Sequence, residues 1–313
     1  MGITNKLVLS SGKLNDKYIT KREILYQGTN GMNVERIYLS HSESYIFKPL
    51  TNNSQVGQEG WIHEQILSDL PITYPKIIEK DKDNQWLIVE DLGKVEHTHN
   101  EEVVFQIINQ MVIWQSTSKD KLTSRLLKAP KPFIDEIIAD IITNKNKVLT
   151  TFVNHQVPMN LIKNIYQLLD IRNFSDTRVF SHGDLHLGNY GISNGRVVVL
   201  DWEHAHLNSP YWDLYHLLDM SHPLFPKKTT RELREAAVNY YLEKTDLELQ
   251  QQSFKEGYYL FSAVFSIFMM LLIEDDLNMT DGKWPKDRLI EQRHQTLSNF
   301  VQCSEYLLYE LER

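Results

Sequence analysis

The chain has 313 residues, enough for two packed domains or one large one, and its 42% hydrophobic and 24% charged content is that of a soluble globular protein, which excludes disordered and fibrous classes. Its 41 acidic and 33 basic residues give a formal net charge of −8, whereas nucleic-acid-binding proteins usually carry a basic excess to neutralise phosphates. The single cysteine, Cys303, cannot form an intramolecular disulfide, so it gives no indication of an oxidising compartment.

The N-terminus does not have the pattern of a secretory signal, because residues 1–11 lack a basic stretch followed by an apolar one. We therefore expect a cytoplasmic protein. The most apolar stretch, residues 258–273, is followed by three acidic residues and is too short to cross a bilayer comfortably. We expect this stretch to form a buried core helix, not a membrane span.

The first 90 residues have the pattern of a small sheet with one helix. Alternating apolar residues between turn-forming residues predict five strands, over residues 22–27, 33–40, 44–48, 75–79 and 86–90. Between the third and fourth strands, apolar residues at helical spacing predict a helix over residues 58–70, which Pro71 ends.

Beyond Gly93 the apolar period changes to about 3.6 residues, which is typical of helices. The predicted helices cover residues 100–116, 133–149, 160–169, 230–243, 247–273 and 286–311, and a strand pair over residues 191–200 interrupts them. The predicted fold class is therefore α+β. It has an N-terminal lobe of residues 1–90, a hinge of residues 91–94, and a mainly helical C-terminal lobe of residues 95–313.

A catalytic motif occupies the segment from His182 to Asn189, which reads His-Gly-Asp-Leu-His-Leu-Gly-Asn, and a second aspartate, Asp201, ends the next strand. This is the spacing of a kinase catalytic loop. Asp184 is placed to accept or orient the proton of an attacking hydroxyl. Asn189 and Asp201 supply the oxygen ligands that Mg²⁺ prefers. We expect these two residues to be the metal ligands.

Two other interpretations of the motif are less favoured. His182 and His186 are four residues apart, a spacing that binds zinc on a helix, but Gly183 and Gly188 break a helix here and the glutamate of zinc proteases is missing. A purely structural hairpin would leave unexplained why Asp201 ends an apolar strand at the spacing of a metal ligand.

Lys48, at the end of the third predicted strand, is the expected partner of this motif. The order of three strands and a helix places it where kinases hold the α- and β-phosphates of the nucleotide, and an acidic residue of the following helix should pair with it. Glu59 and Glu64 are both available. They are five residues apart and point to different sides of a helix, and we favour Glu59 because it lies in the first turn.

Two further segments are candidates for the nucleotide site. The turn around Gly28 and Gly31 could cover phosphates, since glycines let backbone amides approach phosphate oxygens, although a full Gly-x-Gly-x-x-Gly pattern is absent. The apolar strand over residues 86–90 leads into the hinge, where an adenine would find backbone donors and acceptors between two lobes.

The motifs in residues 88–92, 182–189, 198–203 and 213–214 resemble those of the aminoglycoside phosphotransferase and choline kinase family, and the resemblance extends over residues 28–218. It implies a protein kinase-like fold of two lobes, with ATP and Mg²⁺ as cofactors. It also implies that Asp184 is the catalytic base and that Asn189 and Asp201 hold the metal.

The resemblance further assigns phosphate binding to Lys48 and adenine binding to the backbone from Glu90 to Leu92, and we place Ile46 and Leu200 in the same nucleotide site. By the same resemblance, Asp213 braces the catalytic loop without touching the substrate, and His182 supports the loop as well.

The segment after Asp201 favours a small-molecule acceptor over a protein. Trp202 and Glu203 replace the Phe-Gly of protein kinases, and only eleven residues separate Asp201 from Asp213, too few for a peptide-holding activation segment. We expect a hydroxyl of a small molecule, such as an aminated sugar or amino alcohol, to receive the γ-phosphate. Acidic residues 274–276 could rim the cleft and favour a cationic acceptor. The alternative function is a catalytically silent nucleotide-binding or regulatory module.

Overall fold

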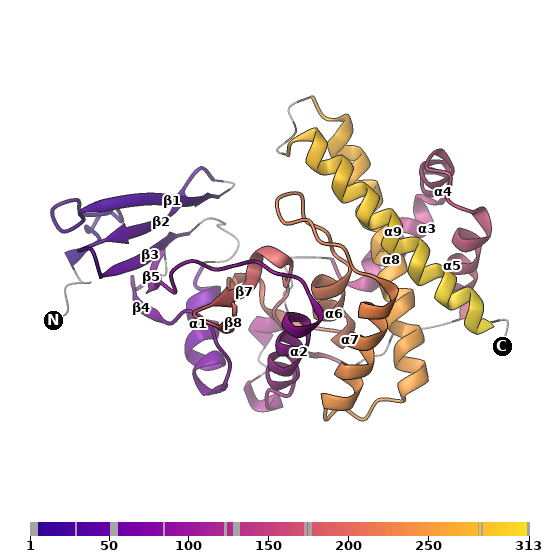
Figure 1. The fold of residues 1–313 in the computed structure, drawn as a ribbon, viewed down its shortest axis with the longest axis horizontal. Coiled ribbons are helices and arrows are strands. Elements are labelled where there is room, and N and C mark those ends of the chain that lie inside the picture. Colours follow the sequence, from indigo (N-terminus) through magenta and orange to yellow (C-terminus); the bar gives the residue numbers. More distant parts are fainter. Residues whose placement is uncertain are drawn as a thin grey trace.

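The computed structural model describes residues 6–28, 30–50, 56–83, 85–121, 124–127, 132–171, 174, 177–280, 282 and 284–311. In these segments a small antiparallel sheet lies at one end of the molecule and a larger, mainly helical part at the other (Figure 1). The predicted α+β arrangement of a sheet-based N-terminal lobe and a helical C-terminal lobe is confirmed. The residue boundaries given for the two lobes and the hinge stay a prediction.

The N-terminal sheet contains all five predicted strands. In chain order they are β1 (Lys21–Gln27), β2 (Asn33–Tyr38), β3 (Ser44–Pro49), β4 (Ile77–Lys80) and β5 (Trp86–Glu90). Their order across the sheet is β1-β2-β3-β5-β4, and every neighbouring pair is antiparallel. The sheet has a small apolar cluster of its own, formed by Leu7, Leu14, Ile37, Phe47 and Ile88. Lys48 follows Phe47 on β3, so its side chain leaves the opposite face of the sheet from this cluster.

Helix α1 (Gln58–Gln65) is shorter than the predicted helix over residues 58–70. The chain leaves the helix at Ile66 and continues as a 3₁₀ turn over Leu67–Asp69. The hydroxyl of Ser68 donates to the carbonyl of Glu64 at 3.0 Å, and such side-chain bonds compete with the regular helical pattern. Ile62 and Ile66 belong to the large core of the helical part, so α1 joins the two lobes.

The helical part contains α2 (Glu101–Gln115), α3 (Ile134–Thr143), α4 (Lys145–Asn154), α5 (Met159–Ile171), α6 (Pro210–Leu218), α7 (Arg231–Lys244), α8 (Gln251–Asn278) and α9 (Lys286–Leu311). The single helix predicted over residues 133–149 is two helices, α3 and α4. They are separated at Asn144, whose side chain donates to the carbonyl of Asp140, because asparagine bonds its own backbone neighbourhood and so ends helices.

Short strands frame the catalytic motif. The predicted strand pair is confirmed as β7 (Tyr190–Ser193) and β8 (Arg196–Val199), joined through Asn194 and Gly195, which both have positive φ. A second pair, β6 (Val179–Ser181) with β9 (His206–Asn208), was not predicted, and neither was α6. All nine residues of α6 are buried, so it lacks the polar face that a search for amphipathic periodicity needs.

Helix α8 is long and apolar enough to cross a membrane, but 72% of its most apolar stretch is buried inside the protein. It packs along α9, and Figure 1 shows the two helices side by side at the far end from the sheet. This packing confirms the prediction that residues 258–273 form a core helix.

Candidate active site

A cavity of about 740 Å³ lies between the sheet and the helical part. Ten of the eleven residues predicted for the site line it: Gly28, Ile46, Lys48, Glu59, Glu90, Leu92, Asp184, Asn189, Leu200 and Asp201. The eleventh, Gly31, is not among the lining residues. Its amide donates to the carbonyl of Gly28 at 3.0 Å and is therefore used within the turn between β1 and β2.

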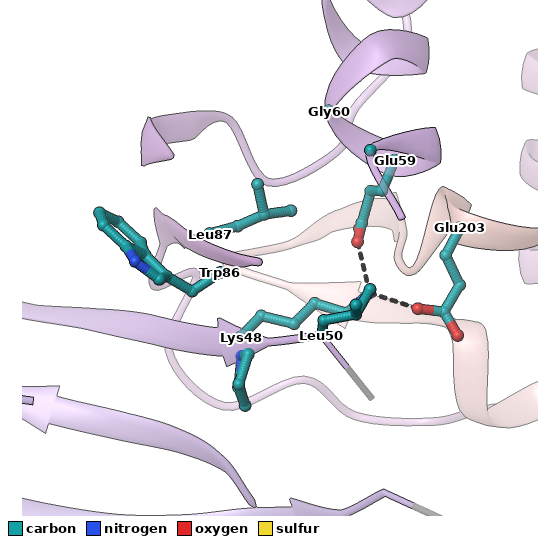
Figure 2. A pocket seen from close by; sticks show the side chains of 9 residues that line it. Lys48, Leu50, Glu59, Gly60, Trp86, Leu87 and Glu203 are labelled. Atoms are coloured by element: carbon teal, nitrogen blue, oxygen red, sulfur yellow. Dashed lines mark hydrogen bonds and ion pairs between the residues drawn. The ribbon is translucent and has the colours of Figure 1, made fainter. Parts of the chain in front are cut away.

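Lys48 forms ion pairs that link the two lobes. Its Nζ lies 2.6 Å from Oε2 of Glu59 on α1 and 2.7 Å from Oδ1 of Asp201 in the C-terminal lobe. Glu203 is a third acidic neighbour, at 3.5 Å. Figure 2 shows Glu59 and Glu203 approaching the end of the Lys48 side chain from two sides. The amine is thus held at the junction of β3, α1 and the segment after β8.

The choice between Glu59 and Glu64 is settled in favour of Glu59. Glu64 points away from the cavity and pairs with Lys80 on β4, at 2.8 Å, with its side chain 55% exposed. Glu59 lies in the first turn of α1 with its side chain only 12% exposed.

Asp201 reaches Lys48 because its backbone takes an unusual conformation. Its φ of 57° lies in the left-handed region, which costs free energy for a residue other than glycine and is held only by a strong surrounding structure. That structure is the buried ring of Trp202, which packs edge-on against Trp114 and parallel to Phe180. Trp202 thereby fixes the turn that presents Asp201 and Glu203 to Lys48.

The charges around Lys48 shift the pKa values of the cluster. Burial opposes the charge of the Lys48 amine, but Asp201 and Glu59 outweigh burial and raise the pKa of Lys48 above its usual value. Burial alone would raise the pKa of Asp201, but the Lys48 amine lowers it, so Asp201 is ionised. Burial and the neighbouring Asp201 raise the pKa of Glu203 to about 7. A further positive charge at this cluster would be favourable.

The catalytic loop is braced by Asp213, as the resemblance implied. The carboxylate of Asp213 accepts hydrogen bonds from the backbone amides of His182 at 2.9 Å and Gly183 at 3.1 Å, and from Nε1 of Trp114 at 3.0 Å. The buried ring of His182 bonds the carbonyl of Leu200 at 2.8 Å and so ties the loop to the strand that leads to Asp201. Gly183 has a φ of 86°, and a β-carbon there would collide with the carbonyl of His204.

Asn189 is fixed beside Asp184 within the loop. Its Nδ2 donates to the backbone carbonyl of Asp184 at 2.8 Å. The backbone carbonyl of Asn189 accepts from the amide of Leu200, also at 2.8 Å. The first bond uses the amide nitrogen, so Oδ1 is the atom that Asn189 can offer to a metal. Asn189 and Asp201 line the same cavity from adjoining segments.

The residues at this site fit Mg²⁺ and do not fit zinc. Within the described part of the chain, the group placed to hold a metal ion is Glu59, Asp201 and Glu203, whose carboxylate oxygens lie within 4.8 Å of one another. An all-oxygen donor set suits Mg²⁺. The zinc interpretation fails because the rings of His182 and His186 are used inside the loop, His186 accepting from the amide of Gly188 at 2.9 Å. Sequence reasoning did not assign Glu203 to the metal, although it follows Asp201 by two residues.

An apolar slot occupies the hinge side of the cavity. Ile46 and Val34 line it from the sheet, Leu200 lines it from the C-terminal lobe, and residues 89–93 form its edge. Asp91 holds the hinge against the sheet by pairing with Nε of Arg36 at 2.8 Å, and the Ser193 hydroxyl donates to the carbonyl of Leu92. A flat heterocycle fits between such apolar walls, with backbone groups at its edge.

The cavity also has an aromatic wall next to the catalytic loop, which sequence reasoning did not find. We define the acceptor wall as His222, Leu224 and Phe225, from the loop between α6 and α7, together with Trp284, which precedes α9. The signal in the sequence is weak, because these residues come from two separate segments and follow no period.

The acidic residues 274–276 do not rim the cavity. Glu274 pairs with His155 at 2.9 Å and with Arg293 at 3.2 Å, and Asp275 pairs with Lys147 at 2.7 Å. None of residues 274–276 is among those that line the cavity. The expectation that these residues rim the acceptor cleft is wrong, and the cationic partners of Glu274 and Asp275 belong to the protein itself.

Comparisons with known proteins agree with this geometry. The model of the phosphotransferase enzyme family matches residues 142–250, which contain the catalytic loop, Asp201 and Asp213. No curated protein sequence matches the chain.

Three solved structures share the fold. A choline kinase from Cryptosporidium parvum is 14% identical with a TM-score of 0.57, covering 99% of this chain and 95% of that one. The streptomycin–ATP ternary complex of APH(2″)-IIa is 15% identical with a TM-score of 0.54, covering 92% and 95%. The macrolide 2′-phosphotransferase MphH from Brachybacterium faecium is 10% identical with a TM-score of 0.54, covering 88% and 91%.

The structural likenesses confirm the protein kinase-like fold. The family match confirms the resemblance to phosphotransferases that the catalytic-loop motif indicated, and together these findings support a small-molecule phosphotransferase.

Proposed function

We propose that the chain is an ATP- and Mg²⁺-dependent phosphotransferase that moves the γ-phosphate to a hydroxyl of a small molecule, with an aminated sugar or an amino alcohol as the expected acceptor class. The observation that carries this proposal is the meeting of Lys48, Glu59, Asp201, Asp184 and Asn189 in one cavity from both lobes. These side chains offer the groups that phosphoryl transfer needs, which supports the proposal.

The nucleotide would lie along the cavity from the hinge to Asp201. The apolar slot at Ile46 and Leu200 suits an adenine, and Lys48, held by Glu59, suits the phosphates. The ATP complex of a structural relative supports ATP as the donor.

Mg²⁺ would be held by Asp201 and by Oδ1 of Asn189, with Glu203 next to them. When bound, the ion would neutralise negative charge on the transferring group. The acidic group at Lys48 supports this assignment, because three carboxylates face one amine and leave the cluster with an excess of negative charge.

Asp184 would act on the acceptor. Its carboxylate would accept the proton of the attacking hydroxyl as the oxygen forms a bond to the γ-phosphorus, and the bond between that phosphorus and the bridging oxygen of ADP breaks. Asp213 and His182 hold the loop so that Asp184 does not have to be ordered during the reaction.

The segment after Asp201 supports a small acceptor. Residues 202–212 form a 3₁₀ turn, strand β9 and the start of α6, and β9 pairs with β6 inside the protein. This segment is buried structure and leaves no extended surface for a peptide.

The proposal is tested by measuring ADP formation with Mg²⁺–ATP across a panel of alcohols: aminoglycosides, macrolides, amino sugars, choline, ethanolamine and thiamine. Wild type should turn over at least one acceptor, and Asp184→Ala should lose turnover but keep its affinity for ATP. Asp201→Ala should lose turnover and, unlike Asp184→Ala, should also weaken nucleotide binding in the presence of Mg²⁺. ATP binding without turnover of any acceptor would instead identify a catalytically silent module.

A further inference from the structure

The loop between α6 and α7, which carries three residues of the acceptor wall, is fixed against the catalytic loop. The ring of Phe225 covers Gly188, and a β-carbon on Gly188 would lie 2.6 Å from two of its ring atoms. The ring of His222 stacks on His186 with centroids 4.4 Å apart and planes 14° apart. The acceptor wall is therefore in direct contact with the catalytic loop, which carries Asp184.

The same loop is tied down at both ends. At its start, the carbonyl of Ser221 accepts from Nε2 of Gln292 on α9 at 2.8 Å. At its end, the buried amine of Lys227 donates to the carbonyl of Leu217 at 2.6 Å, and the hydroxyl of Thr229 donates to the carbonyl of Leu218. Figure 1 shows the loop extending past the ends of α6 and α7 on the side where α8 and α9 join. A loop held at both ends can present a pre-formed binding surface.

The aromatic surface continues from this loop to the start of α9. Trp284 meets His222 edge to face, with centroids 5.3 Å apart, and Phe225 meets His97 with centroids 5.0 Å apart. His222, Phe225 and Trp284 are half-buried, so each keeps part of its ring on the cavity. Rings of this kind bind a flat or apolar ring face and contribute through stacking.

The charges of the cavity are concentrated away from this wall. Its acidic lining residues are Glu59, Glu90, Asp91, Asp184, Asp201 and Glu203. Glu59, Asp201 and Glu203 surround Lys48, Asp91 pairs with Arg36, and the carboxylate of Glu90 accepts from the amide of Lys76 at the hinge. Among the described lining residues, Asp184 is thus the carboxylate on the catalytic loop, which the acceptor wall contacts.

We infer that the acceptor wall selects a cyclic alcohol with at most one positive charge, whose ring face lies on His222, Phe225 and Trp284. Among the described residues that line the cavity at this wall, a polycation would meet the carboxylate of Asp184, so most of its ammonium groups would lose hydration without gaining a partner there. This inference rests on the proposed function and narrows its acceptor class. An aminated sugar with a single amine agrees with both the proposed function and this inference.

The test compares acceptor kinetics between wild type and three single variants, Phe225→Ala, His222→Ala and Trp284→Ala. Each should raise the KM for the best acceptor about tenfold, as expected for the loss of one aromatic contact, and change the KM for ATP less than about twofold. Phe105→Ala is the matched control, because Phe105 stacks on Tyr240 outside the cavity, and it should change neither KM.

The acceptor panel should include neutral, singly charged and polycationic cyclic alcohols of similar size. The inference predicts the highest kcat/KM for neutral or singly charged compounds. Highest kcat/KM for a polycation, or an unchanged acceptor KM in all three variants, would overturn this inference and leave the proposed function standing. ATP binding without turnover of any compound would overturn the proposed function and this inference with it.

Discussion

The ring of Phe225 packs so closely on Gly188 that a β-carbon there would lie only 2.6 Å from it. Gly188 belongs to the catalytic loop and Phe225 to the acceptor wall, 37 residues further along the chain. The glycine of the motif thus has a packing role, since it admits an aromatic ring from another segment against the backbone next to Asn189.

This contact predicts that the effects of Gly188→Ala and Phe225→Ala are not additive. Gly188→Ala alone should push the Phe225 ring away and lower kcat/KM for the acceptor about tenfold or more, because overpacking displaces neighbouring groups. In a Phe225→Ala background the added methyl group no longer meets the Phe225 ring but still meets Cε1 of His186 at 2.7 Å, so the further loss should be smaller than in the wild-type background. Equal losses in both backgrounds would contradict the contact.

Glu59 and Glu64 offer a matched pair on one helix. Glu59→Gln removes the charge that holds Lys48 and should lower kcat/KM for ATP roughly ten- to a hundredfold. Glu64→Gln breaks an exposed pair with Lys80 and should change kcat/KM for ATP less than about twofold. Steady-state kinetics at varied ATP concentration measure the effect of each variant. A larger effect of Glu64→Gln than of Glu59→Gln would show that Glu59 is not the functional partner of Lys48.

His63 makes the N-terminal lobe sensitive to acid. It is 8% exposed, and burial together with the nearby Lys48 lowers the pKa of His63 to about 3, below its usual value near 6.5. At pH values between these two pKa values, the histidine is protonated in the unfolded chain and neutral in the folded one, so the unfolded chain binds more protons. The free energy of unfolding should fall as pH drops from about 6.5 towards 3, by up to about 1.4 kcal/mol per pH unit from this residue.

Denaturant unfolding at several pH values tests this dependence. His63→Leu should reduce the slope of the free energy of unfolding against pH in that window. His294→Leu, at an exposed position on α9, is the control and should leave the slope unchanged. A slope that is the same in wild type and His63→Leu would contradict a buried, neutral His63.

A buried ion pair joins the end of α6 to α7. Arg234 Nη2 and Asp219 Oδ1 are 2.7 Å apart with both side chains fully buried, and Asp219 also accepts from the hydroxyls of Tyr258 at 2.6 Å and Ser262 at 2.8 Å. Asp219→Ala should lower the free energy of unfolding by about 3–5 kcal/mol, because it leaves the Arg234 charge buried without its partner. Lys147→Ala, which breaks a half-exposed pair with Asp275, should cost less than about 1 kcal/mol. Similar losses in the two variants would contradict this difference.

Most of the fold was predictable because its elements have a visible period. The strand over residues 86–90 and the helix over residues 286–311 have the predicted bounds. Helix α6 was missed because all its residues are buried, and the break between α3 and α4 was missed because it depends on one asparagine side chain.

The nucleotide and metal side of the site was predictable for a different reason. Lys48, Asp184, Asn189 and Asp201 lie in short motifs whose spacing follows from the chemistry of phosphoryl transfer. The acceptor side depends on contacts between distant segments, such as His186 with His222 and His222 with Trp284, and no local pattern marks them. The sequence leaves Glu59 and Glu64 as possible partners of Lys48, and only the placement of α1 against the cavity selects Glu59.

Mass spectrometry of the acceptor after reaction with Mg²⁺–ATP tests the central claim most directly. The account predicts that the acceptor gains one phosphoryl group, that ADP forms in equal amount, and that Asp184→Asn, which keeps the size of the side chain but removes the base, abolishes the product while ATP still binds. Phosphorylated acceptor formed by Asp184→Asn at the wild-type rate would contradict it.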